Sequence, residues 1–217
     1  MTERRETSYV WVTWISRLLA GEAHCEWAAW FRAHHTYEKR PTNFDFAKWN
    51  AEHGQMVRER AVALAKEGFN VGIEEQNKLN LKGGSGATLG GKPDLIAVRE
   101  GTVLVVDCKT GQTRGADYFQ VLIYMLALPM CRPQYKDSAL SGRVDYRDNT
   151  IQIPAEELTE EATSRAWELI ERVVGDSEPP RVPSAGECAF CDITHRDCPD
   201  RIDEAPDSVQ GEELAPF

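Results

Sequence analysis

The sequence has no long apolar run, no apolar N-terminus and no excess of basic residues. Its 217 residues contain no uncharged stretch that approaches the roughly 20 apolar residues needed to cross a bilayer. The opening residues, MTERRETSYV, are charged where a secretory leader is apolar. We therefore expect a cytoplasmic protein with no membrane partner. The formal net charge of −10 argues against a generally basic nucleic-acid-binding protein.

Half of the negative charge lies in one C-terminal segment. Residues 200–217 contain six acidic residues and one arginine, so −5 of the −10 belongs to this segment. We expect it to be a disordered acidic tail, because it has little apolar surface to bury. The chain is 41% hydrophobic, which supports a sizeable core, and we expect residues 1–199 to form one domain. A local basic groove is compatible with this charge distribution.

Disulfides are not expected, because a reducing cytoplasm keeps thiols free, and metal binding is the better explanation for six cysteines. The solitary ones are Cys25, Cys108 and Cys131, and Cys131 is expected to be a free thiol. The others form a C-x2-C-x6-C pattern at Cys188, Cys191 and Cys198. Three thiolates are one ligand short of a closed tetrahedral set. His195, inside the pattern, would complete a zinc site, and Cys25 is the alternative fourth ligand.

Hydrophobic periodicity and turn signals predict a mixture of helices and strands. Helices are expected over residues 12–33 with an interruption near Gly21, 46–67, 116–128 before Pro129, and 154–175. Strands are expected over 71–81, 92–98 and 102–109, with a hairpin over 142–154 and a flexible glycine-rich loop at 83–91. The tight turn at Glu100-Gly101 predicts that the two strands beside it are antiparallel neighbours.

Charged residues occur on those two strands, in the stretch KPDLIAVREGTVLVVDCKTGQ. Strand alternation puts Asp107 and Lys109 on one face and Cys108 on the other, and Asp94 lies one strand over. Two neighbouring carboxylates repel each other unless a cation neutralises them, and carboxylate oxygens suit Mg²⁺ or Mn²⁺. A divalent ion can polarise a phosphate and lower the pKa of a bound water, and Lys109 beside it can position that water or stabilise negative charge, which together are the requirements of phosphodiester hydrolysis. The alternative is a surface hairpin with an ordinary ion pair, since D-x-K is a common pattern.

The order of the surrounding parts favours the metal site. A helix with a histidine, a strand with PD, a turn, a strand with DCK, and a helix with QVLIY resemble the PD-(D/E)XK nuclease superfamily and its RecB-like branch. The resemblance covers residues 44–128 and implies an α/β core with a central mixed sheet flanked by helices. The metal ligands that it implies are His53, Asp94, Asp107 and the backbone carbonyl of Cys108. Asp94, Asp107 and Lys109 would be catalytic, and Gln120 and Tyr124 would lie beside the site and bind the substrate.

The residues outside the acid–lysine pattern each have a second, structural interpretation. His53 could be a packed core histidine, since it lies on an apolar stripe. Gln120 and Tyr124 are one helical turn apart and could cap the core with their polar ends. Glu75 is either an outer residue of the metal site or a surface charge.

The cysteine pattern adds a second resemblance. CRISPR-associated RecB-like exonucleases, the Cas-four family, hold a [4Fe-4S] cluster with one cysteine upstream of the nuclease core and three downstream. The corresponding residues here are Cys25, Cys188, Cys191 and Cys198. The resemblance then spans nearly the whole chain, as N-terminal helices, a core at 44–175 and a cysteine region at 186–199. Such a cluster would tie the two ends of the domain together.

The resemblance implies a metal-dependent DNA nuclease, a single-strand exonuclease that processes DNA ends. CRISPR spacer acquisition with integrase proteins and DNA repair are the roles that it implies. A rival interpretation is a DNA-end-binding or assembly subunit with the same fold and weak catalysis. A small electron carrier would leave Asp94, Asp107 and Lys109 unexplained.

Overall fold

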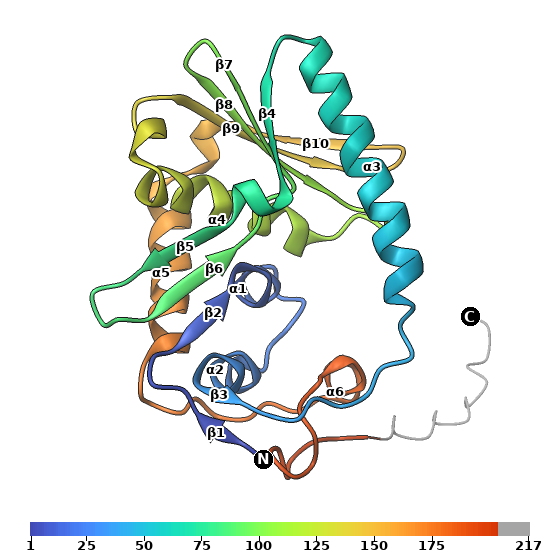
Figure 1. Ribbon diagram of the computed structural model, residues 1–217. Coiled ribbons are helices and arrows are strands. Elements are labelled where there is room, and N and C mark those ends of the chain that lie inside the picture. Colours follow the sequence, from blue (N-terminus) through green and yellow to red (C-terminus); the bar gives the residue numbers. More distant parts are fainter. Residues whose placement is uncertain (204–217) are drawn as a thin grey trace, which may run out of the picture.

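The computed structural model describes residues 1–203, and a five-stranded mixed sheet is its largest sheet (Figure 1). The strand order is β10-β9-β8-β7-β4. Strands β7 and β8 are antiparallel, as the turn predicted, and β9 pairs with β10 as the predicted hairpin. The β8–β9 pair is parallel, which makes the sheet mixed. The strands are β4 (Asn70–Ile73), β7 (Leu95–Arg99), β8 (Thr102–Cys108), β9 (Ala139–Asp145) and β10 (Thr150–Ile153).

Helices cover both faces of this sheet. Helix α3 (Phe46–Lys66) packs on one face and α4 (Gly115–Cys131) on the other. Side chains of β8 pack against both helices, because successive side chains of a strand point to opposite faces of the sheet. Val103 and Val105 pack in the α4 cluster, whereas Leu104, Val106 and Cys108 pack in the α3 cluster. Asp107 therefore shares its face with α4.

A second, three-stranded sheet has the order β2-β6-β5 and contradicts two predictions. The expected strand 71–81 is two strands in different sheets, separated by the 3₁₀ turn η1 (Glu74–Asn77), because the backbone reverses at Glu74 with a φ of 43°. The expected loop 83–91 ends in a strand that pairs with both of its neighbours. The three strands are β2 (Tyr9–Trp11), β5 (Leu79–Lys82) and β6 (Thr88–Gly91).

The remaining helices pack around α4 and the N-terminal region (Figure 1). The interruption predicted near Gly21 separates two N-terminal helices, and α4 continues past Pro129 by two residues instead of ending before it. The other elements are α1 (Val12–Leu19), α2 (Glu26–His34), α5 (Glu160–Val174), α6 (Ala185–Phe190), β1 (Glu3–Arg4), β3 (His35–Thr36), η2 (Pro133–Tyr135) and η3 (Ala155–Glu157).

Local sequence signals set the limits of the long helices. The Asp45 side chain accepts a hydrogen bond from the Lys48 amide at 2.9 Å and caps α3. Gly68, with a φ of 89°, follows its end. Thr159 caps α5 in the same way, by accepting from the Ala162 amide at 3.1 Å. These caps explain why the predicted limits of α3 were accurate.

The expected disordered tail falls mainly on residues 204–217, which lie outside the described residues. Residues 200–203 are described. The side chain of Arg201 is buried, and its guanidinium donates hydrogen bonds to the backbone carbonyls of Cys188, Cys191 and Ile193. None of the helices in residues 1–203 has the length and apolarity that a membrane crossing needs.

Candidate active site

Asp94 and Asp107 lie on neighbouring strands and are both buried. Asp94 directly precedes β7, and its Oδ2 accepts a hydrogen bond of 2.7 Å from the Cys108 amide at the end of β8. Asp107 is 2% exposed and Asp94 is 7% exposed. Buried carboxylates need cations or hydrogen-bond donors to compensate their lost hydration. The groups around each of them therefore indicate what the site is built to hold.

Lys109 is the cation nearest to Asp107. Its Nζ lies 2.6 Å from Asp107 Oδ2 and 3.5 Å from Asp117 Oδ1. Burial alone would lower the pKa of Lys109, but the two carboxylates outweigh it, so the pKa is raised and the ammonium stays charged. Asp117, which the sequence did not single out, also accepts a hydrogen bond from the Tyr146 hydroxyl at 2.9 Å.

Burial opposes the ionised form of Asp107 even beside this lysine. Burial raises the pKa of its carboxyl to about 6, and Asp94 adds to the rise while Lys109 opposes it. Its Oδ1 accepts a hydrogen bond of 3.1 Å from Gln120, and its buried Oδ2 pairs with the Lys109 ammonium. A further cation at this carboxylate would stabilise its ionised form.

Gln120 and Tyr124 form a buried support beneath the acid–lysine pair. The Gln120 side chain accepts from Lys109 Nζ at 2.9 Å and donates to Asp107 and to the Tyr124 hydroxyl. The hydroxyl also accepts from the Lys92 amide at 3.4 Å, and the ring lies against Gly91, where a Cβ would be 2.5 Å from Cε1. The polar ends of these side chains thus hold the position of Lys109.

His53 faces Asp94 from α3. Its Nε2 lies 3.1 Å from Asp94 Oδ1, and this hydrogen bond raises the pKa of His53. The imidazole stacks on Trp49, with ring centroids 4.8 Å apart and planes 12° apart. His53 therefore lies in the acidic site and not inside the apolar core.

The structure adds Glu74, which sequence reasoning missed. His53, Glu74 and Asp94 each offer one ligand atom, and these atoms all lie within 4.8 Å of one another. The left-handed φ of 43° at Glu74 turns this residue back toward Asp94, and its amide donates to the Asp94 carbonyl at 2.8 Å. The buried side-chain amide of Asn77 donates to the backbone carbonyl of Gly72, before the turn, and to those of Pro93 and Asp94, at the start of β7. Asn77 thereby stabilises the unusual backbone.

The sequence singled out the neighbouring residue instead. Glu75 has a side chain that is 79% exposed and lies 3.0 Å from Lys92 Nζ. Of its two interpretations, the surface charge is the correct one. The acidic pair in GIEEQNK was the available signal, but only the η1 turn determines which member faces Asp94.

This donor set suits a hard divalent cation. Carboxylates with an imidazole are ligands for Mn²⁺ or Mg²⁺. The groups open onto a cleft of about 850 Å³. Its walls also include Trp11, Trp49, Lys92, Cys108, Lys109, Arg114, Asp117, Gln120 and Tyr124.

The cysteines Cys25, Cys188, Cys191 and Cys198 line one separate cavity. The Arg32 guanidinium donates to Cys191 Sγ at 3.3 Å, and the Glu187 carboxylate accepts from the Cys25 amide at 3.3 Å. Helix α6 is thereby joined to the start of α2.

The described part of the chain does not assemble the expected zinc alternative. Zn–S bonds of about 2.3 Å put tetrahedral ligand atoms about 3.8 Å apart. In residues 1–203, no three atoms among the cysteine sulfurs and the His195 ring nitrogens lie within 4.8 Å of one another. The His195 imidazole instead lies 2.6 Å from Asp203 Oδ2.

Comparison with known proteins identifies the family. A family model described as "PD-(D/E)XK nuclease superfamily" matches residues 3–199. A search of the curated proteins found no match. One similar solved structure, "Crystal structure of SSO0001", is 16% identical, with a TM-score of 0.46, over 87% of this chain and 85% of that chain. A likeness this weak adds nothing to the assignment.

Proposed function

The chain belongs to the PD-(D/E)XK nuclease superfamily, and from that membership we propose that it is a Mg²⁺- or Mn²⁺-dependent deoxyribonuclease. The observation that carries the proposal is the contact set at the open cleft. Asp107 on β8 and Lys109, which directly follows β8, are 2.6 Å apart, and the ligand atoms of His53, Glu74 and Asp94 lie within 4.8 Å of one another beside them.

Each residue at the site has its own role in the proposed reaction. His53, Glu74, Asp94 and Asp107 would hold the cation, with the Cys108 backbone carbonyl as a further ligand. The bound cation would polarise the phosphate and lower the pKa of a water molecule. Lys109 would orient that water or stabilise the negative charge that develops on the phosphate. Gln120 positions the lysine through its 2.9 Å hydrogen bond.

We assign the protein to the RecB-like branch and, within it, to a Cas-four-like single-strand exonuclease that processes DNA ends. The support is the position of His53 beside Asp94 and of the Q-x-x-x-Y pair beneath Lys109. Action during CRISPR spacer acquisition, with integrase proteins as partners, or in DNA repair follows from this assignment. A cytoplasmic location agrees with both roles.

A [4Fe-4S] cluster held by four cysteines is the second cofactor in this proposal. Its support is that Cys25, Cys188, Cys191 and Cys198 line one cavity. The Arg32 guanidinium beside Cys191 Sγ suits a thiolate. These residues would hold the cluster between α2 and α6.

Nuclease activity is tested with a labelled single-stranded oligonucleotide. Wild-type protein should degrade it with Mg²⁺ or Mn²⁺ and stop when EDTA is added. Asp107→Ala should be folded and inactive, since it removes the carboxylate next to Lys109. Val62→Ala, an exposed position on α3, is the matched control and should cleave normally. Full activity of Asp107→Ala would refute the proposed site, and DNA binding without any cleavage by wild-type protein would favour a binding subunit.

A further inference from the structure

Helix α3 is longer than the sheet that it covers. Its C-terminal part packs under the sheet through Met56, Val57, Ala61 and Leu64. Its N-terminal turns extend past the ends of the strands, toward the side of the molecule that holds α1, α2 and α6 (Figure 1). Residues in this extension therefore receive no cover from the sheet.

The extension and the segment just before it nevertheless carry large aromatic side chains. Phe44 is 53% exposed, Phe46 is 57% exposed and Trp49 is 40% exposed. Phe46, Trp49 and His53 follow the three- and four-residue spacing that places side chains on one helical face. Exposed large aromatic groups that cluster in this way mark a binding surface more often than an ordinary solvent-facing surface.

The rings form one continuous series that ends at the proposed metal site. Phe44 and Phe46 have ring centroids 4.9 Å apart, and Phe44 and Trp49 are 6.5 Å apart. Trp49 lies face to face with His53 at 4.8 Å, and His53 contacts Asp94. Trp49 also lines the active-site cleft, so the exposed surface is continuous with the site.

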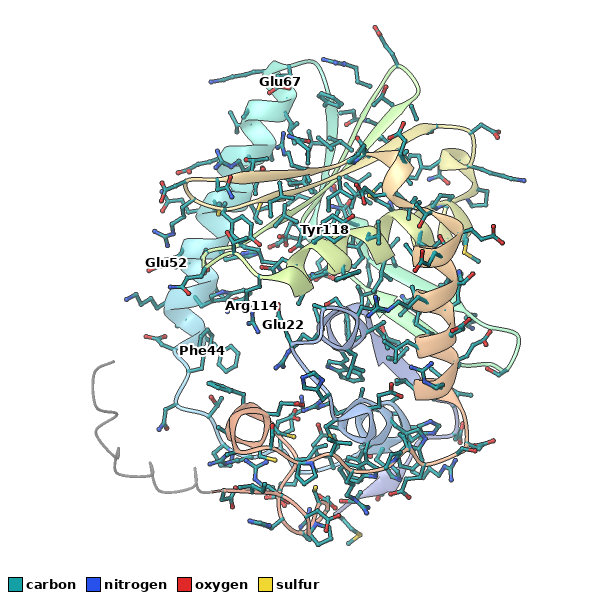
Figure 2. All side chains as sticks on the ribbon, turned by 180° about the vertical axis from the view of Figure 1, so that it is seen from behind. Glu22, Phe44, Glu52, Glu67, Arg114 and Tyr118 are labelled. Carbon is teal, nitrogen blue, oxygen red and sulfur yellow. The ribbon has the colours of Figure 1, made fainter. Side chains whose placement is uncertain are left out.

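A basic side chain on another wall of the cleft can reach a phosphate backbone. Arg114 lines this cleft with its side chain 54% exposed, and its guanidinium lies 2.7 Å from Glu22 Oε2. Figure 2 shows the ring of Phe44 at the N-terminal end of α3, directed toward the part of the molecule in which Arg114 lies. Aromatic rings that stack on bases, opposite basic groups that follow the phosphates, are the usual way to bind single strands.

We propose that Phe44, Phe46 and Trp49 form a stacking platform for unpaired bases of the strand that is cleaved at the Asp94–Asp107 site. This inference rests on the proposed nuclease function and specifies how that site holds its substrate. The platform would accept any base, because every base has a π face. It would discriminate against paired DNA, because bases inside a duplex are already stacked on each other.

The test measures affinity apart from cleavage. A labelled oligothymidine is titrated by fluorescence anisotropy with Ca²⁺ replacing Mg²⁺, so that binding is measured without turnover. Phe44→Ala with Phe46→Ala should weaken binding about tenfold or more, which corresponds to about 1.4 kcal/mol. These two residues are chosen because they do not touch His53, and Val62→Ala on the same helix is the control.

Two further comparisons make the test specific for stacking. An abasic strand keeps the phosphates but has no bases, so wild type and the double variant should bind it equally weakly. Phe44→Tyr with Phe46→Tyr should restore binding, and the leucine pair, which is apolar without a π face, should not. At saturating oligonucleotide with Mg²⁺, kcat of the double alanine variant should be unchanged while KM rises.

The outcomes separate the platform from the nuclease. Unchanged DNA affinity in the double variant, with Asp107→Ala inactive, would overturn the platform alone and leave the rings as a surface for another protein. Equal loss of affinity on abasic strands would also overturn it, because phosphate contacts would then explain the effect. Full activity of Asp107→Ala would remove the proposed function, whatever the affinities show.

Discussion

A methyl group at position 91 would occupy space that the Tyr124 ring already fills. The Cβ of an alanine there would lie 2.5 Å from Tyr124 Cε1 and 3.1 Å from Val12 Cγ2. Carbon atoms in favourable contact are about 3.5–4.0 Å apart. Tyr124 is 2% exposed, so its ring has no open space into which it can turn. We therefore expect Gly91→Ala to destabilise the protein and to displace Tyr124.

The expected loss of stability depends on how little the Tyr124 ring can move away from the added methyl group. Overpacking a core with one methyl group costs about 1–3 kcal/mol, and contact with an aromatic ring places the expected loss at about 2–3 kcal/mol. For a domain of this size each 1 kcal/mol lowers Tm by about 2–4 °C, so Tm should fall by about 4–12 °C. Displacement of Tyr124 also disturbs Gln120, which holds Lys109 at 2.9 Å. We expect kcat to decrease with little change in metal affinity.

Thermal unfolding followed by circular dichroism measures the stability change. Gly84→Ala is the matched control, because a Cβ at Gly84 meets no atom within 4 Å. Tyr124→Leu should relieve much of the clash, so Gly91→Ala should cost less in that background than in wild type. A Gly91→Ala protein with unchanged Tm and kcat would refute the argument that close packing against Gly91 positions Tyr124 and Gln120.

Lys109→Ala should keep metal and DNA binding and lose kcat, because the ammonium acts on water or on developing charge. Single-turnover assays measure the chemical step, and parallel titrations measure metal and DNA binding. An unchanged kcat would make Lys109 an ordinary ion-pair residue. Glu74→Ala should weaken Mn²⁺ affinity by about tenfold or more in calorimetry, whereas Glu75→Ala should not, and equal effects would contradict the assigned direction of the η1 turn. Protein prepared without oxygen should be brown and contain iron, and Cys25→Ser should lose that iron and melt earlier; colourless protein whose one zinc survives Cys25→Ser would decide against the cluster.

The sequence alone predicted the parts of the site that depend on local geometry. Asp107 and Lys109 share a face because alternation along one strand places them there. The Glu100-Gly101 turn makes β7 and β8 antiparallel neighbours, which brings Asp94 to the end of β8. Helix α3 begins where it was predicted for a similar reason, since the hydrogen bond that the Asp45 side chain accepts comes from an amide only three residues away.

Only the tertiary structure decided contacts between segments that are distant in the sequence. The expected strand 71–81 divides between two sheets because its halves have different pairing partners, and that division turns Glu74, and not Glu75, toward Asp94. Asp117 approaches Lys109 because α4 packs across the end of β8. The aromatic residues of α3 follow the same helical period as its core residues. They are exposed because the sheet ends before the helix does, and a hydrophobic period along one helix carries no information about the length of its partner.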